Sequence, residues 1–310
     1  MSPANRFLRL SMLLVLVAFG SGCDNSNDSG GSAGSDADPD PNAVAFGFTG
    51  AFEAYVVPDA AVALRIVALG ASGGDAETDE AAAIVRGGYG AKVDMTIDAT
   101  PGDLLTIVVG ERPVLQVAGN DGCGASGGGG SYVVLVPTGM SAYDESDGGS
   151  YVGAALAVAG GGGGSSGYHA FGGLDAGTTE AGVDSGEGSD LQAGGLSGAG
   201  GAAEYAGGGG GFSGSGTSNA PSEGGDSFRL GSAGGGRDDD EGCGTIARGG
   251  YGGGGGGEYD DSGAGGGYSG GGAAGSYEAG GGGSLDSSSE GSVTVRTGRG
   301  HGSVVITPIF

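Results

Sequence analysis

The residues of this chain that could do chemistry are few, and their spacing points away from catalysis. Histidine occurs only at His169 and His301, and neither lies in a motif typical of a catalytic triad or a metal site. The nucleophile-elbow pattern G-x-S-x-G occurs at 163–167 and 267–271, but the chain has 82 glycines and composition alone accounts for such matches. The sequence therefore predicts a protein that is not an enzyme and has no cofactor.

Two acidic runs, "RDDDEG" (237–242) and "EYDD" (258–261), are the remaining candidates for ion binding. Carboxylate oxygens are ligands that Ca²⁺ prefers, but the spacing of an EF-hand loop is absent. Weak binding of Ca²⁺ by these acidic loops is one interpretation. Solvated loops that bind nothing are the other.

The first 22 residues have the pattern of a secretory leader. Arg6 and Arg9 precede a short apolar run at 10–19, small residues follow, and Cys23 comes directly after them. Ten apolar residues are too few to cross a bilayer, which takes about 20. The pattern resembles a bacterial lipoprotein signal, in which that cysteine carries the lipid; the alternative is plain secretion. Residues 23–43 are acidic and rich in Gly, Ser and Pro, which indicates a disordered tether.

The other two cysteines lie in matching settings, Cys123 in "DGCGAS" and Cys243 in "EGCGTI". With Cys23 assigned to the lipid, only this pair remains in an exported chain, where disulfides persist. We expect them to be bonded, closing a loop of about 120 residues that is worth about 4–5 kcal/mol in the chain-entropy model. Two free thiols too far apart to bond are the alternative.

The charge of the chain limits its partners. The formal net charge is −26, and basic residues are not clustered with aromatic ones. So acidic a surface repels nucleic acid and anionic lipid headgroups. We therefore expect no nucleic-acid partner, and contact with a membrane only through the lipid.

Short apolar segments separated by turn residues predict an all-β fold. The residues of 91–97 alternate between apolar and polar, and "TPGD" at 100–103 is typical of a turn. This spacing favours an antiparallel sandwich. The strands are expected in 44–159 and again in 291–310, with 160–290 inserted between the two parts, and they are predicted at 44–50, 51–58, 62–70, 88–97, 104–110, 131–137, 155–160, 291–297 and 302–309.

The glycines concentrate in the stretch 160–283, which holds 52 of them. Collagen is excluded because glycine does not recur every third residue, and no nonapeptide calcium-binding repeat is present. Disorder fits the composition. So does a bundle of extended threefold helices, the glycine counterpart of polyproline II, whose backbones bond laterally to one another. The entropy cost of ordering glycine and the gain from the hydrogen bonds are comparable, so composition leaves both open.

The order of the strands and glycine runs resembles a known family. "RGGYGAKVDMTIDATPGDLLTIVVG", "LAVAGGGGG", "GGYGGGGGGEYDDSGAGGGYSGGG" and the final "GSVVITPI" are similar to the glycine-rich domain of the anaplastic lymphoma kinase and leukocyte tyrosine kinase receptors. The resemblance covers 44–310. It implies a tumour-necrosis-factor-like (jelly-roll) sandwich with an inserted bundle of polyglycine-II helices. The kinase motifs of those receptors are absent from this sequence, so it implies no kinase.

The tyrosines of the glycine-rich stretch could form a ligand face, because Tyr is common in binding surfaces. Alternatively they flank the bundle. They are Tyr168, Tyr205, Tyr251, Tyr259, Tyr268 and Tyr277.

The function expected from these features is binding or adhesion at a cell surface, by a lipoprotein of the bacterial envelope. Its ligand would be an extracellular protein or a glycan. A structural stalk or matrix protein without a specific ligand is the alternative. A receptor-like ectodomain for a protein ligand is a more remote one.

Overall fold

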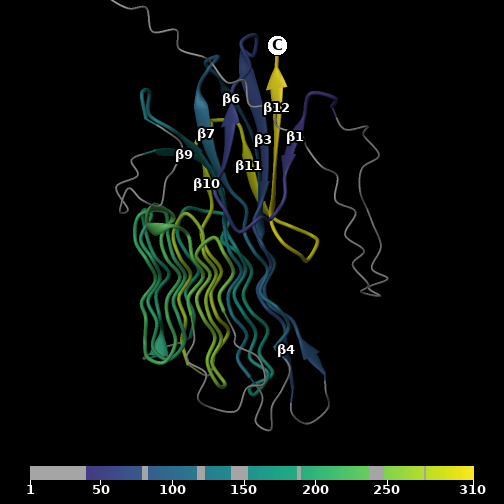
Figure 1. Ribbon diagram of the computed structural model, residues 1–310. Helices are drawn as coiled ribbons and strands as arrows, with labels where there is room; N and C mark the ends of the chain where they lie inside the picture. The colour runs from purple at the N-terminus through teal and green to yellow at the C-terminus, as the bar shows by residue number, and fades with distance from the viewer. Residues whose placement is uncertain are drawn as a thin grey trace, which may run out of the picture. The chain divides into compact units, whose positions relative to one another are not determined.

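The computed structural model describes residues 40–78, 83–116, 123–140, 153–186, 190–236, 248–275 and 277–310. Two five-stranded antiparallel sheets pack together as a β-sandwich, as predicted (Figure 1). The described residues contain no α-helix; η3 (Phe228–Leu230) is a short 3-10 turn.

The first sheet joins strands from the two ends of the described chain. Val44 lies opposite Ile306, and Ile306 lies opposite Ile66, so the last strand is in the interior of the sheet. This confirms the expectation that the C-terminal strands pair with those of the first half. The order is β1 (Val44–Phe46), β12 (Ser303–Ile309), β3 (Ala63–Leu69), β6 (Ala91–Asp98) and β11 (Ser292–Val295).

The second sheet is largely a meander of consecutive strands. Its order is β10 (Leu285–Asp286), β9 (Ala154–Ala159), β8 (Ser131–Leu135), β7 (Leu104–Val108) and β2 (Glu53–Val56). A separate two-stranded sheet pairs β4 (Ala76–Glu77) with β5 (Ile84–Val85). Since β10 pairs with β9, the sandwich resumes at residue 285, earlier than the expected 291.

The sequence of each long strand accounts for its place. In β6 the predicted alternation holds, with Ala91, Val93 and Met95 buried and the residues between them more exposed. Pro308 lacks an N–H and would interrupt a central strand. It is tolerated in β12 because it lies beyond the residues that pair with β1, which end at Ile306.

The main core fills the space between the two sheets. Leu64 and Ile66 from β3 pack with Leu105 and Ile107 from β7, and all four side chains are at most 1% exposed. Burying apolar area at about 25 cal/mol per Å² is the main force that stabilises such a sandwich.

A second core covers the outer face of the second sheet. Val108, Tyr132 and Val158 contact Phe212 and Phe228, which the glycine-rich stretch supplies. The strands β7, β8 and β9 are therefore buried on both faces, which accounts for their continuous apolar runs. These contacts attach the glycine-rich part to the sandwich.

The five glycines that follow β9 are buried, and other backbone segments surround them. Gly161 donates its N–H to the carbonyl of Gly266 at 2.7 Å, and Gly164 donates to Gly263 at 2.9 Å. Residues three apart thus bond to the same neighbouring segment.

The next two residues that are three apart, Gly162 and Ser165, bond to a different neighbouring segment. Gly162 donates to the carbonyl of Ala71 at 3.0 Å, and Ser165 donates to that of Gly74 at 3.2 Å. Carbonyls follow the rule as well, since Gly160 accepts the N–H of Ala91, the first residue of β6, and Gly163 accepts that of Gly88. Through their backbone N–H and C=O groups, residues 160–166 bond to six neighbours, which are residues 71–74, 88–91, 125–128, 171–174, 263–266 and 282–284. We call this hydrogen-bonded set of segments the glycine lattice.

At many of its glycines the lattice leaves no room for a side chain. A Cβ at Gly161 would overlap the carbonyl oxygen of Gly128, and one at Gly163 would overlap that of Ala279. This close approach explains why the chain passes from the apolar strand β9 directly into glycine.

The lattice is not confined to the expected insertion. Three of the segments bonded to 160–166 come from the first half of the chain, at 71–74, 88–91 and 125–128. Figure 1 shows these traces running beside those of the later glycine runs. The sandwich strands β3 and β9 thus continue into the lattice, and β6 and β8 begin from it.

Candidate functional site

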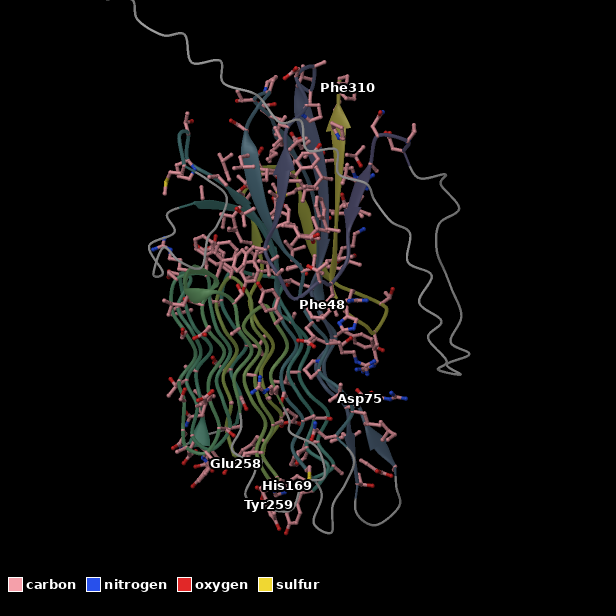
Figure 2. All side chains as sticks on the ribbon, viewed as in Figure 1. Phe48, Asp75, His169, Glu258, Tyr259 and Phe310 are labelled. Carbon is pink, nitrogen blue, oxygen red and sulfur yellow. The ribbon has the colours of Figure 1, made fainter. Side chains whose placement is uncertain are left out.

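The loop that carries the first histidine closes the lattice at the end away from the sandwich. Figure 2 places His169 and Tyr259 at this end and Phe310 at the opposite one. The loop at 167–170 connects two lattice segments through the pairing of Ser166 with Phe171. Loops on rigid scaffolds are common places for binding residues.

Backbone and hydroxyl groups fix this loop in place. Ser166 Oγ donates to the carbonyl of Asp260 at 2.6 Å and accepts the N–H of His169 at 3.2 Å. The N–H of Gly167 donates to the carbonyl of Cys123 at 3.1 Å. The His169 imidazole is therefore carried by a loop whose backbone is held in place by several hydrogen bonds.

His169 lies beside two carboxylates. Its Nε2 is shielded from solvent and lies 3.7 Å from Asp260 Oδ2. One ligand atom from each of His169, Asp260 and the buried Asp261 lies within 4.8 Å of the other two. One nitrogen and two carboxylate oxygens could hold a divalent ion such as Zn²⁺ or Mn²⁺.

Sequence reasoning singled out the carboxylates but not their histidine partner. Asp260 and Asp261 belong to the acidic run proposed for Ca²⁺, and His169 lies far from them in the chain. No spacing rule could have joined them, because the lattice brings them together. The other acidic run, 237–242, lies outside the described residues.

Two of the candidate tyrosines are exposed. The side chain of Tyr168 is 55% exposed and that of Tyr205 is 53% exposed. The ring of Tyr168 packs edge-on against the His169 imidazole, with centroids 4.8 Å apart. Phe171 stacks at 6.1 Å on the same imidazole. Tyr168 therefore belongs to an aromatic patch that includes His169 and Phe171.

Two other candidates belong to the second core. Tyr268 stacks on Phe212 at 6.2 Å, and Tyr251 packs edge-on against Phe52 at 6.3 Å. These two tyrosines flank the lattice at the place where it meets the sandwich. This agrees with the alternative interpretation, in which the tyrosines flank the bundle. Tyr259 and Tyr277 are half-buried.

The serines at the centre of the G-x-S-x-G patterns are structural parts of the lattice. Ser165 and Ser269 are fully buried. Ser165 Oγ lies within hydrogen-bond distance of the carbonyls of Gly74 and Val85, to either of which it can donate its single proton, and Ser269 Oγ accepts the N–H of Gly198 at 3.1 Å. Both hydroxyls are thus engaged with backbone groups.

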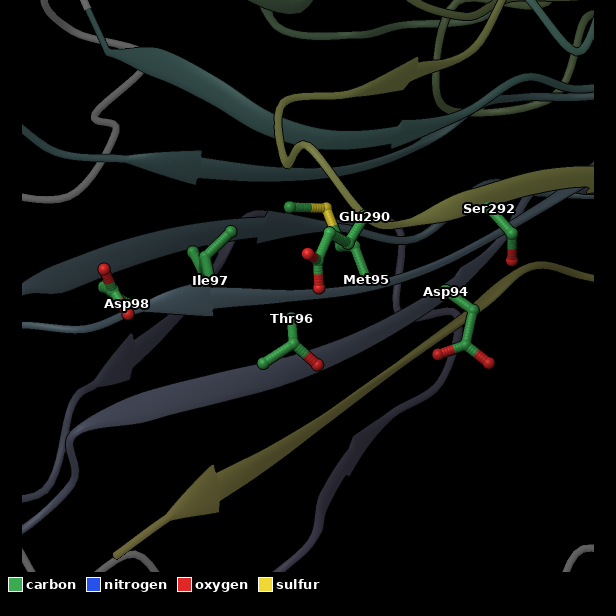
Figure 3. Close-up of a pocket in the computed structure, with 7 residues that line it drawn as sticks. All are labelled: Asp94, Met95, Thr96, Ile97, Asp98, Glu290 and Ser292. Atoms are coloured by element: carbon green, nitrogen blue, oxygen red, sulfur yellow. The ribbon is translucent and has the colours of Figure 1, made fainter.

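A shallow pocket of about 500 Å³ lies on the sandwich, over β6 and the start of β11 (Figure 3). Its charged groups are acidic. Asp94 is bonded to Arg65 on β3, through Nε at 3.1 Å and Nη2 at 3.0 Å, and its pKa is lowered chiefly by that hydrogen bond. The residues that line the pocket are Asp94, Met95, Thr96, Ile97, Asp98, Glu290 and Ser292.

The cysteines are described only in part. Cys123 is buried and disulfide-bonded. Its expected partner Cys243 lies outside the described residues, as does the expected lipid site Cys23. The pairing of Cys123 with Cys243 and the lipidation of Cys23 therefore stay predictions.

The comparisons with known proteins assign no family to the chain. The chain matches no protein-family model and no curated protein. A search of the described residues for a helix long and apolar enough to span a bilayer finds none.

Proposed function

We propose that residues 44–310 form a non-enzymatic binding and adhesion module of a bacterial envelope lipoprotein. A lipid on Cys23 would anchor it, and the acidic stretch 23–43 would act as its tether. Support for the anchor comes from the leader, in which two arginines, an apolar run and small residues precede the cysteine.

We further propose that the lattice segments are polyglycine-II helices, as the receptor resemblance implies. Support comes from the hydrogen bonds of 160–166, which repeat every three residues and reach six neighbours. A threefold helix points successive residues in directions about 120° apart, which gives this repeat. The jelly-roll part of the resemblance has less support, because β7 to β10 form a meander, whereas a jelly roll is built from Greek keys.

The observation that supports the binding function best is an exposed aromatic patch on a loop whose backbone is held by hydrogen bonds. Tyr168 is 55% exposed beside His169 and Phe171, and the loop under them is held by Ser166. A loop that is already ordered loses little entropy on binding, and tyrosine offers a large contact area for two rotatable bonds. The expected ligand is an extracellular protein or a glycan.

Arrays of glycans and of extracellular proteins, probed with the full mature chain, test this function. We expect saturable binding to one class of ligand, weakened about tenfold or more by Tyr168→Ala, because aromatic anchors at hot spots are worth roughly 2 kcal/mol. Tyr205→Ala is the matched control, since that side chain is equally exposed but lies elsewhere in the chain. Absence of saturable binding across both arrays would favour a stalk or matrix role instead.

The anchor has its own experiment. Cells that express the full chain with a labelled fatty acid should incorporate the label into the protein, and Cys23→Ala should abolish incorporation. A secreted, unlabelled protein would show that the leader directs plain export.

A further inference from the structure

A group of arginines surrounds a buried carboxylate between the lattice segment 71–74 and β4. Asp75, marked in Figure 2, has a side chain only 4% exposed. Arg86 Nη1 and Arg112 Nη2 each lie 2.7 Å from its Oδ2, and Arg299 Nη1 lies 3.6 Å from its Oδ1. We call these three arginines and Asp75 the arginine cluster.

A fourth arginine adds positive charge beside the cluster. Arg296, in the connection between β11 and β12, donates from Nη1 to the carbonyls of Gly70 at 2.8 Å and His301 at 2.9 Å. Its pKa is lowered by burial and by the positive charge of Arg112, which places the two guanidiniums within electrostatic reach of each other.

The cluster has more positive charge than its own carboxylate can balance. Asp75 also accepts the N–H of Gly87 at 3.1 Å. The carboxylates of Asp175 and Glu111 accept the backbone N–H groups of Tyr89 and Tyr251, and the ion pairs of the three arginines among the described residues all go to Asp75. Gathering like charges costs Coulomb energy, and an anion bound among them would recover it. The cluster is conspicuous in a chain with only 11 basic residues against 37 acidic ones.

The three arginine side chains of the cluster are partly accessible to solvent. The side chains of Arg86, Arg112 and Arg299 are 54%, 28% and 22% exposed. Arg112 Nε has no hydrogen-bond partner although it is shielded from water. Each guanidinium carries five N–H donors in a planar fork that matches a carboxylate.

Aromatic rings lie next to the cluster. Arg299 lies over the ring of Tyr89, 4.3 Å from its centroid. Phe48 stacks on His301 with ring centroids 4.8 Å apart, and His301 Nδ1 accepts the N–H of Arg112. Rings beside a charged group suit a ligand that carries its anion on a cyclic body.

The charge of the whole protein restricts the ligand further. Because the protein has a net charge of −26, it repels a polyanion over long range. The energy cost of approach is much smaller for a ligand with a single negative charge. We propose that Arg86, Arg112 and Arg299 bind a singly charged carboxylate carried by an acidic sugar. The site shares no residue with the Tyr168 loop and does not rest on the function proposed for that loop.

Calorimetric titration of the full mature chain with glucuronate tests the site, with glucose as the neutral sugar. We expect saturable binding of glucuronate, none of glucose, and a loss of at least tenfold in affinity in Arg86→Gln. Arg86 is the most exposed member, so Asp75 keeps Arg112 and Arg299 in that variant. Arg65→Gln is the matched control, because Arg65 is equally exposed and also pairs with an aspartate. Its affinity should equal that of the unaltered chain.

A second variant separates ligand binding from a purely structural role. Asp75→Asn removes the competing carboxylate, so the proposal predicts tighter glucuronate binding and a larger rise in melting temperature with added glucuronate. A structural role alone predicts a destabilised protein that glucuronate does not rescue. Failure of the unaltered chain to bind glucuronate, or equal binding by Arg86→Gln, overturns the proposal. Sulfate or acetate that binds as tightly as glucuronate overturns the assignment to a sugar acid.

Discussion

At the scale of single residues, the lattice makes glycine a packing requirement. A methyl group at Gly161 would overlap the carbonyl of Gly128, and both backbones are held by hydrogen bonds, so neither can give way cheaply. We expect Gly161→Ala to lower the free energy of unfolding by about 3 kcal/mol, at the upper end of overpacking costs. Chemical denaturation measures this change.

Gly47→Ala provides the control for that substitution. Gly47 is exposed, and a Cβ there meets nothing within 4 Å. The substitution should leave stability unchanged or raise it by about 0.5 kcal/mol through the unfolded chain. Equal losses at both positions would mean that glycine is needed for backbone freedom instead of close packing.

The ion pair on the sandwich predicts a pH dependence at the same scale. The pKa of Asp94 is lowered mainly by the hydrogen bond from Arg65, so the folded state favours the carboxylate. This stability is fully present above the ordinary pKa of about 4 and is lost as pH falls through the lowered value. In Asp94→Asn the loss should be below about 1 kcal/mol near pH 7, since the pair is partly exposed.

Denaturant titrations from pH 7 down to pH 2 check the sign. The difference between Asp94→Asn and the unaltered chain should shrink toward zero in acid. A constant difference across that range would assign the effect to packing and not to charge.

The sequence predicts single residues poorly wherever the lattice brings distant segments together. His169 and Asp260 become neighbours only because two glycine runs bond side by side, and the four arginines gather for the same kind of reason. Tyr251 and Tyr268 look like surface residues because glycine surrounds them in the sequence. They pack in the second core because the lattice lies against the outer face of β7, β8 and β9.

At the scale of elements, strands were predictable where side chains alternate or run apolar. The nine predicted segments each overlap an observed strand, including β12 at the end of the chain. The strands β4, β5 and β10 have two residues each, too few for a pattern. The glycine segments before and after the strands show no apolar–polar pattern either. Such a pattern is formed by side chains, and glycine has no side chain.

Hydrogen exchange tests whether these patternless segments are ordered elements. The N–H groups of Gly161 to Gly164 donate to carbonyls inside the lattice, so we expect their exchange to be as slow as that of Val133 in β8. Protection on the order of a thousandfold over a free peptide corresponds to opening energies of about 4 kcal/mol. Gly139, exposed in a turn, should exchange at nearly the free rate. Fast exchange at all of these glycines would show that the segments are not held.

At the scale of the whole molecule, the sandwich and the lattice share both chain and core. The strands β3 and β9 continue directly into lattice segments, and Phe212 and Phe228 cover the outer face of the second sheet. Tyr132 adds a polar link, because its hydroxyl donates to the carbonyl of Gly267 at 2.9 Å. Melting the lattice alone would expose this face and break that bond, so neither part has a stable surface without the other.

We therefore expect residues 40–310 to unfold in one cooperative transition. Near-UV circular dichroism follows the buried tyrosines at the junction, and hydrogen exchange of Gly161 follows the lattice. The two should give one midpoint, as two-state behaviour requires. Gly161→Ala changes the lattice and Tyr132→Phe changes the sandwich. Within each variant, the unfolding midpoint from circular dichroism and the one from hydrogen exchange should fall by the same amount, because each substitution destabilises the same folded unit. Lattice exchange that rises well before the tyrosine signal changes would instead mean that the sandwich is stable by itself and that the glycine-rich part is an appendage attached to it.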